Sequence, residues 1–194
     1  MMAKYAVIII DMLEEFVRGR LKAEAAEKII PSILRLLEFA RSKGVPIIYT
    51  VDSHYPGIDH ELKLWGPHAI RGSKEAEVVK ELKPLSKDYV VQKRRYDAFM
   101  FTDLDMLLRE LGVTSVILAG IHTHICVQNT ALGAFYRGYR VIIPHECVAA
   151  ATEEWHKRGL EYIKEFSGAE IVSLDQLLKR LEHEVGKEEC PKYM

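Results

Sequence analysis

Short apolar runs alternate with amphipathic segments along most of this chain. The runs are of strand length and cover residues 5–10, 46–51, 88–92, 115–119, 140–143 and 170–172. The segments between them carry apolar residues at helical spacing over residues 23–42, 74–82, 104–111, 125–136, 152–166 and 174–184. The stretch 52–72 is polar and contains several glycines and prolines, so we expect a loop there.

This alternation predicts an α/β fold, with a doubly wound, six-stranded, mostly parallel sheet and helices on both faces. Residues 1–185 are expected to form a single domain, and residues 186–194 a charged C-terminal tail. In such sheets ligands bind at the carboxyl ends of the strands. No glycine-rich phosphate loop follows the first strand, which argues against a nucleotide-binding module.

Composition excludes several classes of partner. The formal net charge is -1 and no basic patch stands out, so we expect no binding to nucleic acid. No apolar run approaches the roughly 20 residues of a membrane helix, so we expect no membrane association. The 3 cysteines are widely spaced and odd in number, which favours a reducing compartment, and we expect a cytoplasmic protein.

Reactive side chains follow the predicted strands. Asp11 ends the first strand, Lys93 ends the third, and Cys126 lies just beyond the fourth. Taken singly, these would be a helix or turn cap, a solvated lysine and a small core residue. Together at one sheet edge they indicate thiol chemistry, because a reactive cysteine needs a base or a positive field. Lys93 and the start of a helix would supply the field, and Asp11 could take the thiol proton.

A second group of polar residues follows the second strand. Asp52 and His54 are two residues apart, so extended backbone places both side chains on one face, and His60 and His68 follow. A carboxylate with imidazoles suits a divalent transition metal, namely zinc, with iron or manganese as alternatives. A loop that is merely rich in histidine is the competing interpretation.

Several motifs occur in the order seen in one known family. They are Ile-Ile-Asp-Met around Asp11, Asp-x-His at 52–54, Trp-Gly-Pro-His at 65–68 with Gly72, Lys93 followed by Tyr-Asp-Ala-Phe at 96–99, and Gly-Ile-His-Thr-His-Ile-Cys-Val at 120–127. With these motifs the chain resembles the isochorismatase-like cysteine hydrolases, over about residues 6–178. Within them it is most similar to the nicotinamidase/pyrazinamidase branch.

The resemblance implies a catalytic triad of Asp11, Lys93 and Cys126, with a thioester on the cysteine after ammonia leaves. It also implies a cis peptide bond between Ile121 and His122. The oxyanion hole would then use the backbone N–H groups of His122 and Cys126.

The resemblance further implies metal ligands and pocket residues. Asp52, His54 and His68 would be ligands; His60 has the spacing of a fourth but is equally compatible with a solvated loop residue. Phe16 and Trp65 would flank the substrate ring, and Tyr96 is similar to another pocket residue. The sequence departs from the family pattern at Ala69, where cysteine is usual, and at His124, where aspartate or asparagine is usual.

The function expected from these residues is a cysteine amidohydrolase that releases ammonia from a small amide, with nicotinamide as the leading substrate. The alternatives are a related hydrolase acting on a carbamoyl or ureido compound, or one acting on an isochorismate-like substrate. The expected partner is therefore a small-molecule amide. By analogy with relatives, the protein could also form a homo-oligomer.

Overall fold

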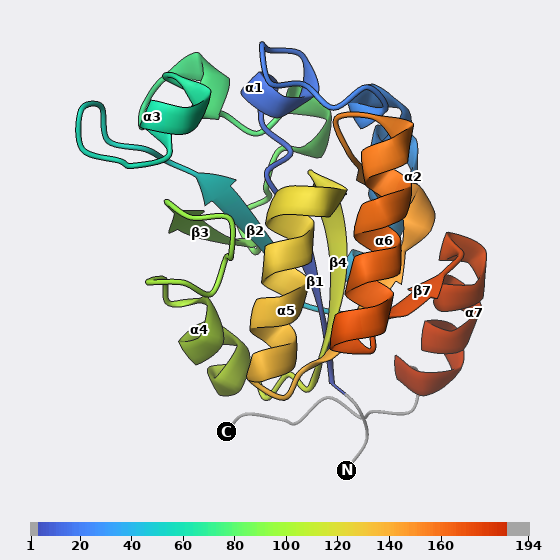
Figure 1. Cartoon of the computed structure of the whole chain (residues 1–194). Coiled ribbons are helices and arrows are strands. Elements are labelled where there is room, and N and C mark those ends of the chain that lie inside the picture. Colours follow the sequence, from blue (N-terminus) through green and yellow to red (C-terminus); the bar gives the residue numbers. More distant parts are fainter. Residues whose placement is uncertain (1–3, 186–194) are drawn as a thin grey trace.

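A computed structural model describes residues 4–185, and the predicted charged tail at 186–194 lies outside the described residues. The sheet has 7 strands, in the order β3-β2-β1-β4-β5-β7, with β6 paired to β4 (Figure 1). All the strand pairings are parallel. The strands are β1 (Tyr5–Ile10), β2 (Ile47–Asp52), β3 (Tyr89–Lys93), β4 (Ser115–Ile121), β5 (Arg140–Pro144), β6 (Val148–Ala149) and β7 (Glu170–Val172).

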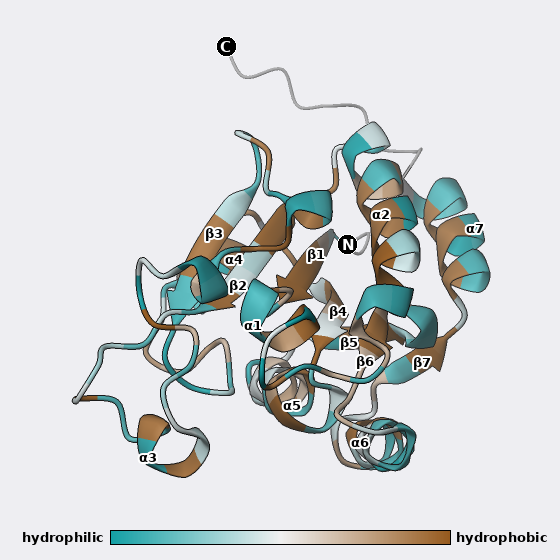
Figure 2. Cartoon of the chain, turned by 90° about the horizontal axis from the view of Figure 1, so that it is seen from above, coloured by the Kyte–Doolittle hydropathy of each residue, from teal (hydrophilic) through white to brown (hydrophobic). Residues whose placement is uncertain are grey.

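Side chains of β1 alternate between two apolar layers, as the strand period of two requires. Val7 and Ile9 pack into one layer, whereas Ala6 and Ile8 pack into the other. The first layer is covered by α2 (Ala26–Ser42) and α7 (Leu174–Val185). The second is covered by α4 (Leu104–Glu110), α5 (Gln128–Tyr136) and α6 (Glu153–Ser167). Figure 2 shows α5 and α6 on the opposite side of the sheet from α2, so the doubly wound fold is confirmed.

The structure differs from the predicted elements in several places. The sheet has a seventh strand, β6, which is only two residues long. The predicted helix at 74–82 is wrong: two 3-10 turns, Lys74–Ala76 and Lys80–Leu82, flank an extended segment. This segment bonds to the chain after β1 instead of to itself, since Val79 N donates to Met12 O at 3.0 Å. Two short helices, α1 (Glu14–Val17) and α3 (Leu62–Trp65), lie in segments without helical periodicity.

The direction of strand addition reverses beside β1. The chain adds β2 and β3 on one side of β1 and then returns to place β4 on the other. Gly120 of β4 permits the close approach of β4 to β1, because a Cβ at this position would lie 2.0 Å from Ile10 O. Such a switch point leaves a crevice at the carboxyl ends of the strands. Among residues 4–185, no helix is both long enough and apolar enough to cross a bilayer.

Candidate active site

The turn after β4 places the sulfur of Cys126 at this crevice. The Ile121–His122 peptide bond is cis, and a single π-helical turn, Thr123–Val127, leads from it into α5. Such turns are frequently found at functional sites. Cys126 is 5% exposed and lines a cavity of about 250 Å³. The helix predicted from residue 125 therefore begins with this turn, and the regular α-helix starts at Gln128.

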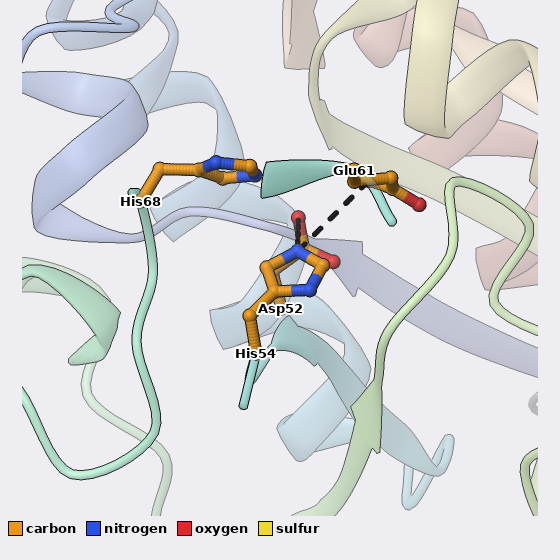
Figure 3. Close-up of side chains that lie close together, drawn as sticks. All are labelled: Asp52, His54, Glu61 and His68. Carbon is orange, nitrogen blue, oxygen red and sulfur yellow. Dashed lines mark ion pairs between the residues drawn. The ribbon is translucent and has the colours of Figure 1, made fainter. Parts of the chain in front are cut away.

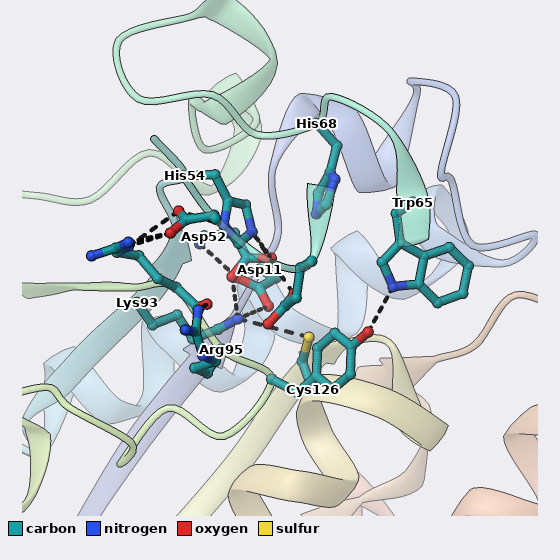
Figure 4. Close-up of polar contacts among 12 residues, drawn as sticks. Asp11, Asp52, His54, Trp65, His68, Lys93, Arg95 and Cys126 are labelled. Carbon is teal, nitrogen blue, oxygen red and sulfur yellow. Dashed lines mark hydrogen bonds and ion pairs between the residues drawn. The ribbon is translucent and has the colours of Figure 1, made fainter. Parts of the chain in front are cut away.

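The ammonium group of Lys93 lies between Asp11, Asp52 and Cys126 and contacts all three (Figure 4). Its Nζ is 2.7 Å from Asp11 Oδ2, 2.6 Å from Asp52 Oδ1 and 3.7 Å from Cys126 Sγ. Strand register explains part of this arrangement, because Asp52 and Lys93 are paired residues of β2 and β3. The three residues expected to form the triad are thus brought together by the ends of β1 and β3 and the turn after β4.

Burial and charge set the protonation of this group. Burial acts to lower the pKa of Lys93, but the Asp11 and Asp52 carboxylates outweigh it and hold that pKa well above its usual value. Burial and the neighbouring Asp52 raise the pKa of Asp11 to about 6. Burial also raises the pKa of the Cys126 thiol. An acid that titrates near neutrality beside a protonated thiol is suited to moving a proton to and from sulfur.

Four buried side chains form a second cluster next to Lys93: Asp52, His54, Glu61 and His68 (Figure 3). Each offers one ligand atom, and these atoms all lie within 4.8 Å of one another. His54 Nε2 is 3.6 Å from Asp52 Oδ2 and 3.9 Å from Glu61 Oε2. His54 Nε2 and Glu61 Oε2 are buried without a hydrogen-bond partner. Because buried polar atoms are nearly always paired, these two fit a bound cation.

Neighbouring groups orient both histidines of the cluster. His54 Nδ1 lies 3.1 Å from Asp59 Oδ2, and Asp59 in turn accepts a hydrogen bond from Arg94 Nε at 2.8 Å. His68 Nδ1 lies 2.8 Å from the carbonyl oxygen of Gly66. When the Nδ1 atom of a histidine donates to an oxygen, Nε2 is left as the metal-binding atom. The donor set of two imidazoles and two carboxylates suits zinc, iron or manganese.

His60 is the one expected ligand that lies outside this cluster. Its side chain is exposed, whereas the adjacent Glu61 is buried and belongs to the cluster. The two residues lie at the start of the turn of α3, where consecutive side chains point in directions about 100° apart. Burial, together with the Asp52 carboxylate, raises the pKa of Glu61 to about 7. Within the cluster, the Glu61 carboxylate therefore occupies the place for which the spacing suggested the His60 imidazole.

Aromatic rings line the cavity above Cys126. Phe16, Trp65 and Tyr96, the three expected pocket residues, all line it, and so does His122. Trp65 Nε1 donates to the Tyr96 hydroxyl at 2.6 Å, which joins α3 to the loop after β3 (Figure 4). The result is a small cavity with a thiol, an apolar wall and a candidate metal centre.

Comparison with known proteins agrees with this geometry. Residues 5–176 match the isochorismatase domain model. The chain belongs to the isochorismatase family. Nicotinamidase 3 of Arabidopsis thaliana is 30% identical, over 91% of this chain and 88% of its own.

Two solved structures of the family are also similar. N-carbamoylsarcosine amidase of Thermoplasma acidophilum has a TM-score of 0.82 and is 38% identical, over 89% of this chain and 97% of its own. Pyrazinamidase of Pyrococcus horikoshii, solved in complex with zinc, has a TM-score of 0.79 and is 29% identical, over 88% of this chain and 99% of its own. The family relationship identifies the chain as a hydrolase of the isochorismatase family.

Sequence reasoning missed several residues of the site. Glu61 and Asp59 follow His54 in a loop without periodicity, and only their acidic character next to the Asp-x-His pair could have indicated a role. Arg20 and Lys22 also line the cavity, as does His124, which the sequence singled out only as a departure from the family pattern. The first two lie in a turn after α1, a helix too short for the hydrophobic pattern to predict.

Proposed function

We propose that the protein is a cysteine amidohydrolase that releases ammonia from a small primary amide through a thioester on Cys126. The observation that carries this proposal is the position of Lys93 Nζ, 2.7 Å from Asp11 and 3.7 Å from Cys126 Sγ at a cavity wall. Nicotinamide is the leading substrate, because an aromatic wall and a candidate metal centre flank the sulfur and because a nicotinamidase is among the relatives.

The first half-reaction forms the thioester. Asp11 takes the thiol proton as Cys126 Sγ attacks the amide carbon, and Lys93 stabilises the developing thiolate. The carbonyl oxygen becomes an oxyanion, which backbone N–H groups of His122 and Cys126 would stabilise. The C–N bond then breaks, and Asp11 returns the proton to the departing nitrogen, which leaves as ammonia. A pKa of about 6 allows Asp11 to serve as both base and acid near neutral pH.

The second half-reaction consumes one water. Asp11 takes a proton from a water molecule as its oxygen attacks the thioester carbon. The C–S bond then breaks, the sulfur regains its proton, and the carboxylic acid leaves. The sum of the two halves converts an amide and one water into an acid and ammonia.

Asp52, His54, Glu61 and His68 would hold the metal ion, and zinc is the leading candidate since the Pyrococcus horikoshii relative was solved with zinc. When bound, such an ion would act as a Lewis acid and orient the substrate beside the sulfur. Asp52 also contacts Lys93, so the same carboxylate positions the ammonium that faces Cys126.

A carbamoyl or ureido compound is the second candidate substrate. Two cationic side chains, Arg20 and Lys22, line the cavity, and nicotinamide has no anionic group for them to bind. N-carbamoylsarcosine amidase is a similar structure at 38% identity. The same thioester chemistry would apply, with the ureido carbonyl in place of the amide carbonyl.

Purified protein should release ammonia from nicotinamide, and Cys126→Ala should abolish this release. Cys147→Ala is the matched control, because Cys147 is a buried thiol that does not line the cavity. A chelator should lower the rate, and added zinc should restore it. Full activity of Cys126→Ala would refute the thioester mechanism, and ammonia from a ureido acid but not from nicotinamide would favour the second substrate.

We also propose a cytoplasmic setting, because a thiol nucleophile works only while it is reduced. A role in salvage of nicotinamide from NAD would follow if nicotinamide is the substrate.

A further inference from the structure

The candidate ligand His68 follows a tight turn whose peptide groups set the direction of its ring. The turn, residues 65–67, comes directly after the single helical turn of α3, and Gly66 at its centre has a φ of 74°. Pro67 follows, and its ring fixes the next backbone angle. His68 is 4% exposed, and its Nδ1 lies 2.8 Å from Gly66 O. The orientation of the His68 ring therefore depends on the peptide group between Gly66 and Pro67.

Arg20 contacts the carbonyl groups on both sides of that peptide group. Its Nη2 donates to Trp65 O at 2.7 Å and to Pro67 O at 3.2 Å. The guanidinium also lies against Gly66, where an added Cβ would be 3.5 Å from Nη2. Within the described part of the chain, no other donor bonds to these two oxygens. Arg20 is thus the side chain that fixes the two peptide groups flanking Gly66 O.

The backbone around Arg20 is itself held against α1. Gly19 packs directly on the chain of that helix, since a Cβ there would lie 2.6 Å from Glu15 O. The buried Glu15 side chain accepts a hydrogen bond from Leu21 N at 3.2 Å. Both neighbours of Arg20 are therefore fixed to α1, and its guanidinium reaches the turn from a defined starting point.

The chain after His68 is anchored separately. His54 N donates to Ala69 O, and Arg71 N donates to His54 O, both at 3.0 Å. These two bonds tie residues 69–71 to the backbone of the second histidine of the cluster. His68 thus lies between this backbone anchor and the contact made by Arg20. Only the Arg20 contact comes from a side chain that can be replaced without changing a candidate ligand.

Charge alone does not favour an arginine at this position. A cation repels a divalent metal ion, and that repulsion weakens metal binding. Arg20 is exposed, and it forms no ion pair with a carboxylate among residues 4–185. A favourable contribution of Arg20 to metal binding can therefore come only from its hydrogen bonds to the turn. The sign of its effect on metal affinity separates the two contributions.

We propose that Arg20 is a positioning residue for the candidate metal centre: by bonding to Trp65 O and Pro67 O, it sets the peptide group that orients His68. The proposal rests on the metal site included in the proposed function, and it adds a residue from outside the segment that supplies the ligands. Groups that orient metal ligands contribute about 10- to 100-fold to metal affinity. Because Arg20 acts one contact further out and is exposed, we expect an effect near the lower limit, about 10-fold.

Zinc affinity, measured by competition with a chromophoric chelator, tests this role without turnover. Arg20→Met keeps the aliphatic stem but has no donor, and it should weaken zinc binding about 10-fold. Arg20→Lys, which keeps one donor group, should retain part of the affinity. Lys22→Met is the matched control, because it removes the same charge from the same cavity without removing a hydrogen bond to the turn. It should leave zinc affinity unchanged or raise it slightly.

Two further measurements show whether Arg20 acts through His68. In a His68→Ala background, Arg20→Met should change zinc affinity little, because the two substitutions remove the same contribution. The other measurement uses metal-free protein: the rate at which diethyl pyrocarbonate modifies His68, followed by mass spectrometry. Arg20→Met should raise this rate, because the buried ring is no longer held, whereas Lys22→Met should not.

The outcomes separate this proposal from the proposed hydrolase function. Unchanged or tighter zinc binding in Arg20→Met would overturn the positioning role, and so would the same loss in the His68→Ala background. Absence of zinc binding by the wild type would overturn it too, whereas ammonia release through Cys126 could still occur. Weaker zinc binding that depends on His68 would support the role of Arg20 even if nicotinamide were not hydrolysed.

Discussion

Gly159 lies where α6 crosses the turn that carries Cys126, and a methyl group there tests how tightly that turn is set. A Cβ at this position would lie 3.0 Å from both the Cα and N atoms of His124 and 3.1 Å from the carbonyl carbon of Thr123. These are backbone atoms, so no side chain can rotate away. In Gly159→Ala, either α6 or the turn must shift by a few tenths of an ångström.

The expected effects on stability and on catalysis differ in size. Alanine is favoured over glycine in a helix by about 1 kcal/mol. Overpacking opposes this by about 1–3 kcal/mol. The free energy of unfolding should therefore fall by at most about 2 kcal/mol. A displacement of 1 Å at a reaction centre lowers rates by about 100-fold, so a shift of a few tenths should lower kcat by roughly 3- to 10-fold.

The assay compares kcat for ammonia release with the midpoint of chemical unfolding, across Gly159→Ala and the larger Gly159→Ser. Lys157→Ala is the control, since it changes an exposed residue of the same helix. The rate of Cys126 alkylation gives a second measure that does not depend on the substrate. Unchanged kcat and alkylation rates in both glycine variants would show that α6 does not set the turn.

Three further predictions concern the buried charges and the candidate metal centre. Burial and, to a smaller extent, the charge of the neighbouring His124 lower the pKa of His122 to about 4. Between about pH 6.5 and 4 the unfolded chain therefore binds a proton that the folded chain does not. As the pH falls through this window, the free energy of unfolding should therefore drop by about 3 kcal/mol more in the wild type than in His122→Gln. Denaturant titrations measure both losses, and equal losses would contradict the prediction. Lys93→Gln leaves two buried carboxylates without their cation and should lower the free energy of unfolding by about 3–5 kcal/mol. The same loss in an Asp11→Asn background would argue against the pairing. Glu61→Gln should weaken zinc binding at least about 10-fold in a competition titration, whereas His60→Gln should not. Weaker zinc binding in His60→Gln but not in Glu61→Gln would instead indicate that His60 is the ligand.

The positions of the reactive residues could be predicted because they depend on strand ends. Asp11, Asp52 and Lys93 each end or follow an apolar run, and the carboxyl ends of parallel strands meet at one edge. Strand boundaries accurate to one residue were sufficient for this inference. The fold class followed in the same way from the alternation of strands and helices.

The ligand set could not be predicted as reliably, because it depends on the path of an irregular loop. Residues 52–72 have no hydrophobic period, and α3 within them is one turn long. Whether His60 or Glu61 faces the cluster depends on where that turn begins. Spacing within the sequence does not determine this start.

The predicted helix at 74–82 was wrong for a tertiary reason. Its polar and apolar residues suit a helix, but the backbone bonds to the segment after β1: Glu14 N donates to Glu77 O at 3.0 Å, and Val79 N donates to Met12 O at the same distance. These contacts join residues far apart in the chain. Local propensity contains no information about them.

The four candidate ligands all come from residues 52–68, whereas the thiol, the amine and the acid facing it come from three separate strand ends. Trp65, part of the cavity wall, belongs to the same segment. An insertion, deletion or exchange within residues 53–68 would replace three of the four candidate ligands and the Trp65 part of the wall together, without moving the reacting sulfur. Divergence of this fold toward new substrates can therefore begin with a change in one loop.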